Sequence, residues 1–220
     1  MHLIKVAAAV LNQTPLAWDA NRANIVEAIS QARDAQVSIL CLPELCITGY
    51  GCEDAFLSAN TRRMAWRVLE EIHRSGRAKA IGVSNFMIPH LEELLPVAEI
   101  SPAVNQIEFH PYLQSKALHE HCRGCGIQLQ AWSPLMHAGA ILRDRVLGKV
   151  AATHARTVAQ IILRWEVQSG VVAIPKSARE YRLAENAAIF DFTLSDAEMT
   201  AINALDRNQR SGADPMNFAF

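Results

Sequence analysis

The sequence lacks several features that would define its class at once. No apolar run approaches the ~20 residues of a membrane-spanning helix, and the N-terminal stretch MHLIKVAAAVLNQTP is interrupted by Asn12 and Gln13. Neither charge dominates, with 21 Lys and Arg against 22 Asp and Glu, so we expect neither a nucleic-acid partner nor binding to an anionic membrane. A G-x-G-x-x-G motif and a P-loop are both absent, which argues against a Rossmann or nucleoside-triphosphate site.

The cysteine count and the lack of a secretory signal together indicate the redox state of the thiols. There are five, an odd number, and no secretory signal precedes them. We therefore expect reduced thiols and a cytoplasmic protein. Its expected partners are small molecules or other copies of the chain.

No linker rich in Pro, Gly or Ser divides the 220 residues, of which half are hydrophobic, so the default is one domain. Apolar runs of strand length alternate with segments of helical period, a rhythm typical of parallel α/β folds with crossover helices. Strands are predicted within 4–12, 37–44, 78–84, 103–109, 127–133 and 171–175. Helices are predicted around Ile25 to Ala32 and at about 62–76, 87–96, 114–124, 142–168 with a break near His154, and 179–187. A last helix begins at the capping box of Ser195 and Glu198.

These elements make about six strand-helix units. A complete eight-fold barrel usually needs about 250 residues and eight units, so this chain is short on both counts.

A carboxylate follows the second predicted strand, in the stretch CLPELCITGYGCED. Glu44 lies where a buried apolar strand ends and a glycine-containing turn begins, a position where desolvation can raise its pKa and make it a general base. This stretch, with the strand and helix of IKVAAAVLNQTPLAWDANRANIVEAI before it, resembles the nitrilase or carbon-nitrogen hydrolase superfamily, in particular the glutaminase domain of NAD synthetases. The resemblance covers about residues 1–60 and implies that Glu44 is the general base.

That family also needs a lysine and a nucleophilic cysteine, which come from later segments without a counterpart here. Cys41, Cys46 and Cys52 surround the glutamate strand, where the family has no nucleophile. A carboxylate without an activated thiolate cannot form a thioester. A structural role for Glu44, tied to neighbouring backbone, therefore outweighs the catalytic one.

From about residue 62 onward the chain resembles the aldo-keto reductases, with the diketogluconate-reductase-like branch closest. The motifs are RRMAWRVLEEIHRSGRAKAIGVSNF, AVNQIEFHPYLQ, GIQLQAWSPL, RTVAQIILRW, VVAIPKSAREYRLAEN and GADPMNF. They correspond to the second half of that family's barrel, its fifth to eighth strand-helix units.

The resemblance implies an NADP(H) site. It assigns the nicotinamide carboxamide to Ser84, Asn85 and Gln106, and the stacking ring to Trp132. It assigns the adenosine 2′-phosphate to Lys176, Ser177 and Arg182, and the adenine to Glu185 and Asn186. Two cations beside a hydroxyl on a strand-to-helix loop suit a dianionic phosphate, which favours NADP over NAD. Singly, these residues also suit structural roles, as helix caps, a core amide or a core ring.

The family's proton donor is a tyrosine tuned by a lysine and an aspartate, with a histidine orienting the substrate, and all four come from the first half of the barrel. The nitrilase-like segment replaces that half here. We therefore predict a recombinant fusion without efficient catalysis and with residual NADP(H) binding, so that classification as an enzyme stays uncertain. The alternatives are an NADPH-dependent aldehyde or ketone reductase with Tyr50 or Glu44 as substitute acid, and a carbon-nitrogen hydrolase remnant.

The two resemblances meet between about Ser58 and Ile72, within one predicted helix. Its apolar residues keep helical spacing across the join at Met64, Val68 and Ile72. We expect one cooperative domain made of segments 1–60 and 61–220, with the first segment completing a half TIM barrel. Half-barrels expose strand edges, so we also expect a homodimer.

The stretch HEHCRGC places four metal-ligand types close together. They are His119, His121, Cys122 and Cys125. Their spacing fits no closed zinc site, and the reductase resemblance makes the stretch the end of a barrel helix. No metal is predicted, and His110 at the end of a strand is expected to be structural.

Overall fold

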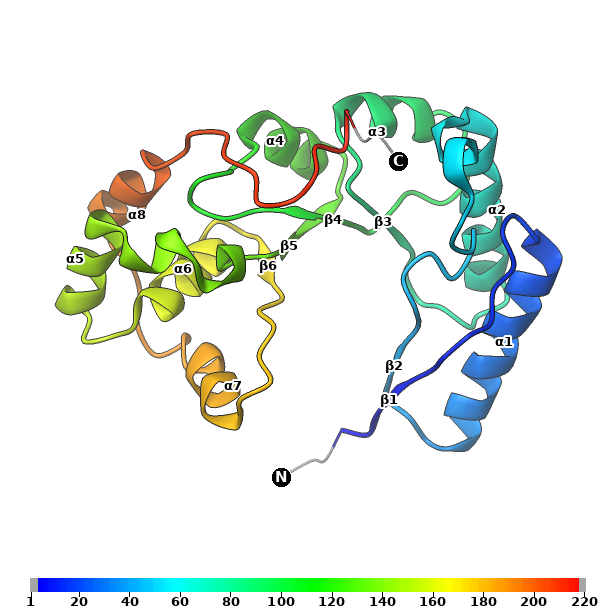
Figure 1. Cartoon of the computed structure of the whole chain (residues 1–220), viewed down its shortest axis with the longest axis horizontal. Helices are drawn as coiled ribbons and strands as arrows, with labels where there is room; N and C mark the ends of the chain where they lie inside the picture. Colours follow the sequence, from blue (N-terminus) through cyan, green and yellow to red (C-terminus); the bar gives the residue numbers. More distant parts are fainter. Residues whose placement is uncertain (1–3, 218–220) are drawn as a thin grey trace. The chain divides into compact units, whose positions relative to one another are not determined.

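A computed structural model gives the fold of the chain and describes residues 4–217. Short parallel strands alternate with helices along the sequence (Figure 1). The chain divides into two compact units, the first with residues 4–81 together with 92–101, the second with 82–91 together with 102–217. The boundary between the units falls within helix α3 (Ile88–Leu94), whose residues 88–91 belong to the second unit and whose residues 92–94 belong to the first.

The first unit is a two-stranded parallel sheet covered by two helices. Its elements are β1 (Val6–Ala8), α1 (Trp18–Asp34), β2 (Ile39–Cys41), a 3-10 helix (Glu53–Leu57) and α2 (Ala59–Arg74). Ala7 lies opposite Leu40 in the sheet. Helices α1 and α2 lie side by side next to these strands (Figure 1), and Ile25, Val68 and Ile72 form the buried core between them. Each such burial contributes about 1.5–3 kcal/mol.

Helix α2 is the predicted helix at the join of the two resemblances, and its amphipathic pattern is confirmed. The Ser58 hydroxyl caps it by accepting from the Asn60 amide at 3.2 Å, and Gly76 follows its end with a left-handed φ of 71°. Its buried Glu70 accepts hydrogen bonds from the backbone amides of Glu99 and Ile100 at 2.7 and 2.9 Å. The helix therefore holds segment 92–101 within the first unit.

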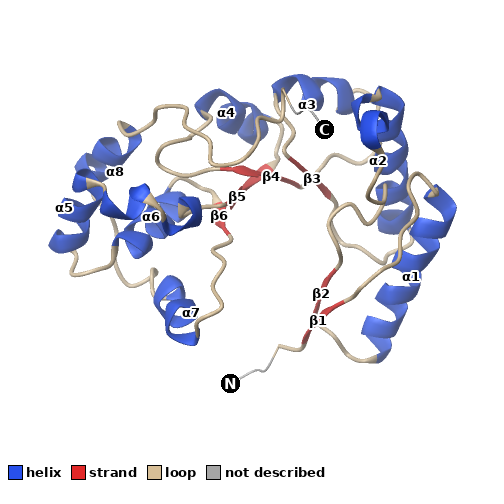
Figure 2. Cartoon of the chain, in the orientation of Figure 1, coloured by secondary structure: helices blue, strands red, loops and turns tan. Residues whose placement is uncertain are grey.

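The second unit is a four-stranded parallel sheet in the order β3-β4-β5-β6, drawn red in Figure 2 with its helices in blue. Its strands are β3 (Gly82–Ser84), β4 (Val104–Glu108), β5 (Gln128–Trp132) and β6 (Val172–Ala173). Its other helices are α4 (Lys116–Gly124), the short 3-10 helices Met136–Ala138 and Ala140–Arg143, α5 (Arg145–Thr153), α6 (Val158–Gln168), α7 (Glu180–Ala187) and α8 (Asp196–Asn203). Ile107, Leu129, Ile161 and Trp165 are buried in its core.

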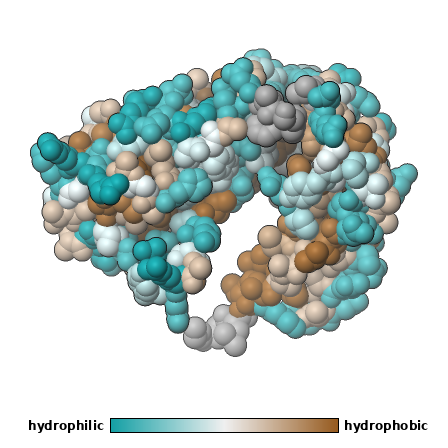
Figure 3. All heavy atoms as spheres, viewed as in Figure 1, coloured by the Kyte–Doolittle hydropathy of each residue, from teal (hydrophilic) through white to brown (hydrophobic). Residues whose placement is uncertain are grey.

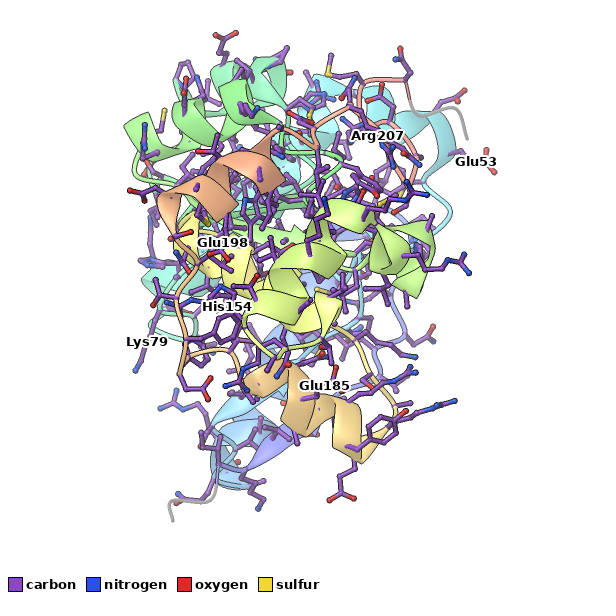
Figure 4. The ribbon with its side chains drawn as sticks, turned by 90° about the vertical axis from the view of Figure 1, so that its left-hand side faces the viewer. Glu53, Lys79, His154, Glu185, Glu198 and Arg207 are labelled. Atoms are coloured by element: carbon purple, nitrogen blue, oxygen red, sulfur yellow. The ribbon has the colours of Figure 1, made fainter. Side chains whose placement is uncertain are left out.

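The predicted parallel α/β fold is confirmed, although the strands are shorter than the apolar runs. The run at 4–12 pairs only over Val6–Ala8, because its partner strand spans only Ile39–Cys41. The predicted break near His154 is confirmed, since α5 ends there and the Thr157 capping box begins α6. The capping box of Ser195 and Glu198 begins α8, and His154 lies beside Glu198 (Figure 4) with Nε2 to Oε1 at 2.9 Å.

Across residues 4–217, none of the helices combines the length and the apolar character that crossing a membrane requires.

Candidate functional site

The candidate site lies at the carboxyl ends of the parallel strands in the second unit. Parallel strands bring their carboxyl ends to one edge of a sheet, where ligands of α/β proteins usually bind. Ser84, Glu108 and Trp132 are the last residues of β3, β4 and β5. In the strand register Ser84 is opposite Gln106 and Glu108 is opposite Trp132.

Hydrogen bonds orient the three side chains assigned to the carboxamide. Asn85 adopts a left-handed φ of 59°, and its Oδ1 accepts from the Trp132 indole Nε1 at 2.8 Å. The Ser84 hydroxyl donates to the Gln106 carbonyl at 3.2 Å, and Gln106 Nε2 donates to Gln130 Oε1 at 2.6 Å. The structure thus places Ser84, Asn85, Gln106 and Trp132 together.

Asn105, which the sequence did not single out, supports this loop. It is fully buried, and its side chain donates to the Phe86 carbonyl at 2.7 Å and accepts from the Phe86 amide at 3.4 Å. Both polar backbone groups of the residue after Asn85 are therefore satisfied by one amide side chain.

A cavity of about 520 Å³ opens beside the Trp132 ring. Lys176 and Arg182 line it together with Ile174, Pro175 and the loop from Ser133 to Ala138. The cavity therefore has one aromatic wall and two cationic side chains.

The other three predicted contacts lie around α7. The Ser177 hydroxyl closes a local turn by accepting from the Arg179 amide at 3.1 Å. Glu185 Oε1 accepts from the Thr157 hydroxyl at the start of α6 at 2.8 Å. Asn186 lines a different, largely apolar cavity of about 610 Å³ between β6, α6 and α7. The structure does not bring Glu185 and Asn186 into the cavity of Lys176 and Arg182.

Sequence reasoning missed the buried Glu108. Its carboxylate accepts from His110 Nε2 at 3.2 Å, from the Ser211 amide at 2.5 Å, from the Ser211 hydroxyl and from the Gly212 amide at 3.3 Å. Burial opposes ionisation, but the hydrogen bonds from His110, Ser211 and Gly212 outweigh it and lower the pKa of Glu108 to about 2. One signal was available, because Glu108 is two residues beyond Gln106 and thus on the same face of β4.

The predicted hydrolase residues lie in the first unit. Glu44 is exposed in the turn after β2, so the burial that was expected to raise its pKa is not found. Cys41 is exposed, whereas the buried Cys52 donates its thiol to the carbonyls of Thr48 and Gly49 at 3.3 Å. Burial raises the pKa of the Cys46 thiol, which disfavours a reactive thiolate.

The stretch from His119 to Cys125 forms the end of α4 and its turn. Cys122 is buried and Cys125 is exposed. Among residues 4–217, no three His, Cys, Asp or Glu side chains gather as a metal ion would require.

Two family profiles match the chain. The profile of the Aldo/keto reductase family matches residues 56–207, and that of Carbon-nitrogen hydrolase matches residues 5–89. The two matches overlap across α2 and the segment up to α3.

Individual relatives agree with the longer match. The chain is 54% identical over 156 residues to the uncharacterized oxidoreductase YtbE of Bacillus subtilis and 54% identical over 155 residues to the glyoxal reductase of that organism. These alignments cover 71% and 70% of this chain but 55% and 56% of the relatives, so the chain spans about half of their length. A crystal structure of a mutant of Gox0644 in complex with NADPH aligns with a TM-score of 0.80 and 34% identity, covering 97% of this chain and 75% of that one.

These relatives correct one prediction. The expectation of a fusion without efficient catalysis is wrong, because the matching region is shared with reductases such as the glyoxal reductase and, at 40% identity over 155 residues, the methylglyoxal reductase DkgA of Escherichia coli. That alignment covers 70% of this chain and 56% of the relative. The alternative, an NADPH-dependent reductase, fits these findings better.

Proposed function

Because the chain belongs to the aldo/keto reductase family, we propose that it reduces small aldehydes or ketones with NADPH. The observation that carries the proposal is the 54% identity to a glyoxal reductase over 70% of the chain, and the family profile matches residues 56–207, which hold the candidate site. Small dicarbonyls such as glyoxal and methylglyoxal are therefore the substrate class proposed first.

The residues at the candidate site suit this cofactor. A dinucleotide needs an aromatic surface for its nicotinamide and cations for its phosphates, and the cavity beside Trp132 offers both, with Lys176 and Arg182. When bound, NADPH supplies the hydride that reduces the carbonyl carbon. The hydrogen bond from the Trp132 indole to Asn85 Oδ1 fixes both side chains before the cofactor arrives, which lowers the entropic cost of binding.

Lys176 and Arg182 are proposed to select NADPH over NADH. Both are cations that line one cavity, and Ser177 lies between them in sequence at the start of the turn before α7. Glu185 and Asn186 are proposed as adenine contacts on α7, where the Thr157 hydroxyl donates to Glu185.

The decisive experiment measures binding and turnover separately. Titration with NADPH should quench the tryptophan fluorescence of the protein and not that of the Trp132→Phe variant. Oxidation of NADPH, followed at its own absorbance band, should then depend on added glyoxal or methylglyoxal. Absence of quenching at millimolar NADPH would refute the proposal.

We further propose that the first ~60 residues share their origin with carbon-nitrogen hydrolases and that α2 is the shared element. The overlap of the two profile matches across α2 supports this. Transplanting residues 4–58 onto the α2 of an intact carbon-nitrogen hydrolase should give a folded protein, and an unfolded product would contradict the shared origin.

A homodimer is the proposed assembly. In the first unit β1 and β2 expose large apolar side chains, with Val6 66% and Ile39 58% exposed, and Val10 after β1 is 97% exposed; Figure 3 shows the hydrophobic surface there. Exposed apolar sheet surface of this kind promotes self-association. Sedimentation velocity should give twice the chain mass, and Val6→Lys with Ile39→Lys should return the monomer.

A further inference from the structure

A segment close to the C-terminus is bound to the end of β4. Ser211 and Gly212 lie 103 and 104 residues after Glu108 in the sequence, yet their amides and the Ser211 hydroxyl all donate to its buried carboxylate. The preceding residues are held as well, because the amides of Arg207 and Gln209 donate to the Tyr112 carbonyl at 3.2 and 3.0 Å. We call the contact of Glu108 with Ser211 and Gly212 the tail latch.

The tail latch presses Gly212 against the Trp132 ring. A Cβ at Gly212 would lie 3.3 Å from Cζ3 of Trp132 and only 2.5 Å from its Cη2, and the second distance is closer than real Cβ atoms approach. The φ of Gly212 lies outside the left-handed region, so the backbone itself does not require glycine. What requires glycine at this position is the close approach of the indole.

The Trp132 ring is thus held at both ends. Asn85 Oδ1 binds its Nε1, and Gly212 abuts its benzene edge. The ring cannot tilt toward the tail without meeting backbone, and it cannot tilt the other way without losing a hydrogen bond of 2.8 Å.

We propose that the tail latch is a positioning device, in which Glu108 fixes Gly212 so that Gly212 sets the orientation of Trp132. Glu108, Ser211 and Gly212 are positioning residues that act through the ring. The consequence for NADPH affinity rests on the proposed function, whereas the effect on the ring does not.

A double-mutant cycle tests the contact without any cofactor. Gly212→Ala should lower the midpoint of thermal unfolding in the otherwise unchanged protein, because its new Cβ meets the outer ring of the indole. In the Trp132→Phe background the same substitution should have no effect, because phenylalanine lacks those ring atoms. Equal effects in the two backgrounds would overturn the proposal. Gly148→Ala, whose Cβ would meet nothing within 4 Å, is the matched control.

A spectroscopic measurement tests the orientation itself. With 5-fluorotryptophan incorporated, the ¹⁹F resonance of Trp132 is the one lost in Trp132→Phe. Gly212→Ala and Glu108→Gln should both shift it and leave the resonances of Trp18, Trp66 and Trp165 in place. An unmoved Trp132 resonance in the folded Gly212→Ala variant would refute the proposal even if Glu108→Gln failed to fold.

Binding measurements then separate this inference from the proposed function. Gly212→Ala should weaken NADPH binding by about threefold to tenfold, the range expected for losing an aromatic stacking contact. If the unchanged protein binds no NADPH, the proposed function fails. The double-mutant cycle and the ¹⁹F resonance of Trp132 then still test whether the tail latch orients the ring. If NADPH binds equally well to both proteins, the tail latch does not act on the cofactor ring, and the inference is wrong.

Discussion

At the scale of single residues, two cations are expected to decide cofactor choice. Replacing both Lys176 and Arg182 by alanine should weaken NADPH binding by about 100-fold or more and NADH binding far less, because each charge-assisted hydrogen bond to a phosphate is worth about 1.5–3 kcal/mol. Isothermal titration with both nucleotides measures this. Lys149→Ala, at an exposed lysine of α5, serves as the control. Equal losses for NADPH and NADH would contradict the assignment to the 2′-phosphate.

A second residue governs stability rather than binding. Glu166 in α6 is fully buried, and neither carboxylate oxygen finds a hydrogen-bond partner within residues 4–217. Burial raises the pKa of Glu166 well above its ordinary value, so the folded protein keeps a proton that the unfolded chain loses as the pH rises past that value. The free energy of unfolding should therefore fall with rising pH until the raised pKa is passed.

Glu166→Leu removes this cost. We expect the variant to be more stable by about 1–3 kcal/mol at pH 8, with the difference shrinking toward pH 4. Urea unfolding at both pH values measures it. The same substitution at the exposed Glu120 of α4 should show no such pH dependence. A destabilised Glu166→Leu variant at pH 8 would show that the carboxyl group has a partner.

The sequence predicted the individual site residues unevenly, for a physical reason. Asn85, Gln106 and Trp132 were assigned from local motifs, because each lies within a strand or directly after one. Two of the partners of Glu108, Ser211 and Gly212, lie 103 and 104 residues away, and no local pattern reports a contact over that separation. The exposure of Glu44 was also unpredictable, since its stretch CLPELCITGY reads as the end of a buried strand whereas only Ile39–Cys41 pair.

At the scale of elements, capping signals were the most reliable guide. The box of Ser195 and Glu198 begins α8 where the sequence placed it, because both of its hydrogen bonds are local. Strand lengths were overestimated, because pairing depends on a neighbouring strand and not on the apolar run itself.

The capping box of α8 gives a prediction for that helix. Ser195→Ala leaves the Glu198 amide without its side-chain acceptor and should lower the free energy of unfolding by about 1 kcal/mol. Chemical denaturation followed by circular dichroism measures the change. Ser101→Ala, at an exposed position outside any helix, should have little effect. Equal losses in both variants would show that the cap contributes nothing specific.

At the scale of the whole molecule, the sequence predicts one cooperative domain, and each unit of the structure has its own buried core. Trp18 and Trp66 lie in the first unit, while Trp132 and Trp165 lie in the second. Two variants, each with one pair replaced by phenylalanine, therefore report on the units separately. Within the first unit, Glu70 joins helix α2 to segment 92–101. Helix α3 has residues in both units, so neither unit can unfold without disturbing this shared helix.

We therefore expect the two fluorescence transitions in urea to coincide with each other and with the loss of helical circular dichroism. Replacing a tryptophan pair by phenylalanine can itself change the stability of the variant. The fluorescence midpoint of each variant is therefore compared with the midpoint of its own circular dichroism curve. Glu70→Ala, which frees segment 92–101, should lower both fluorescence midpoints together if the units are coupled. A first-unit transition that moves alone would mean that the two units unfold independently of each other.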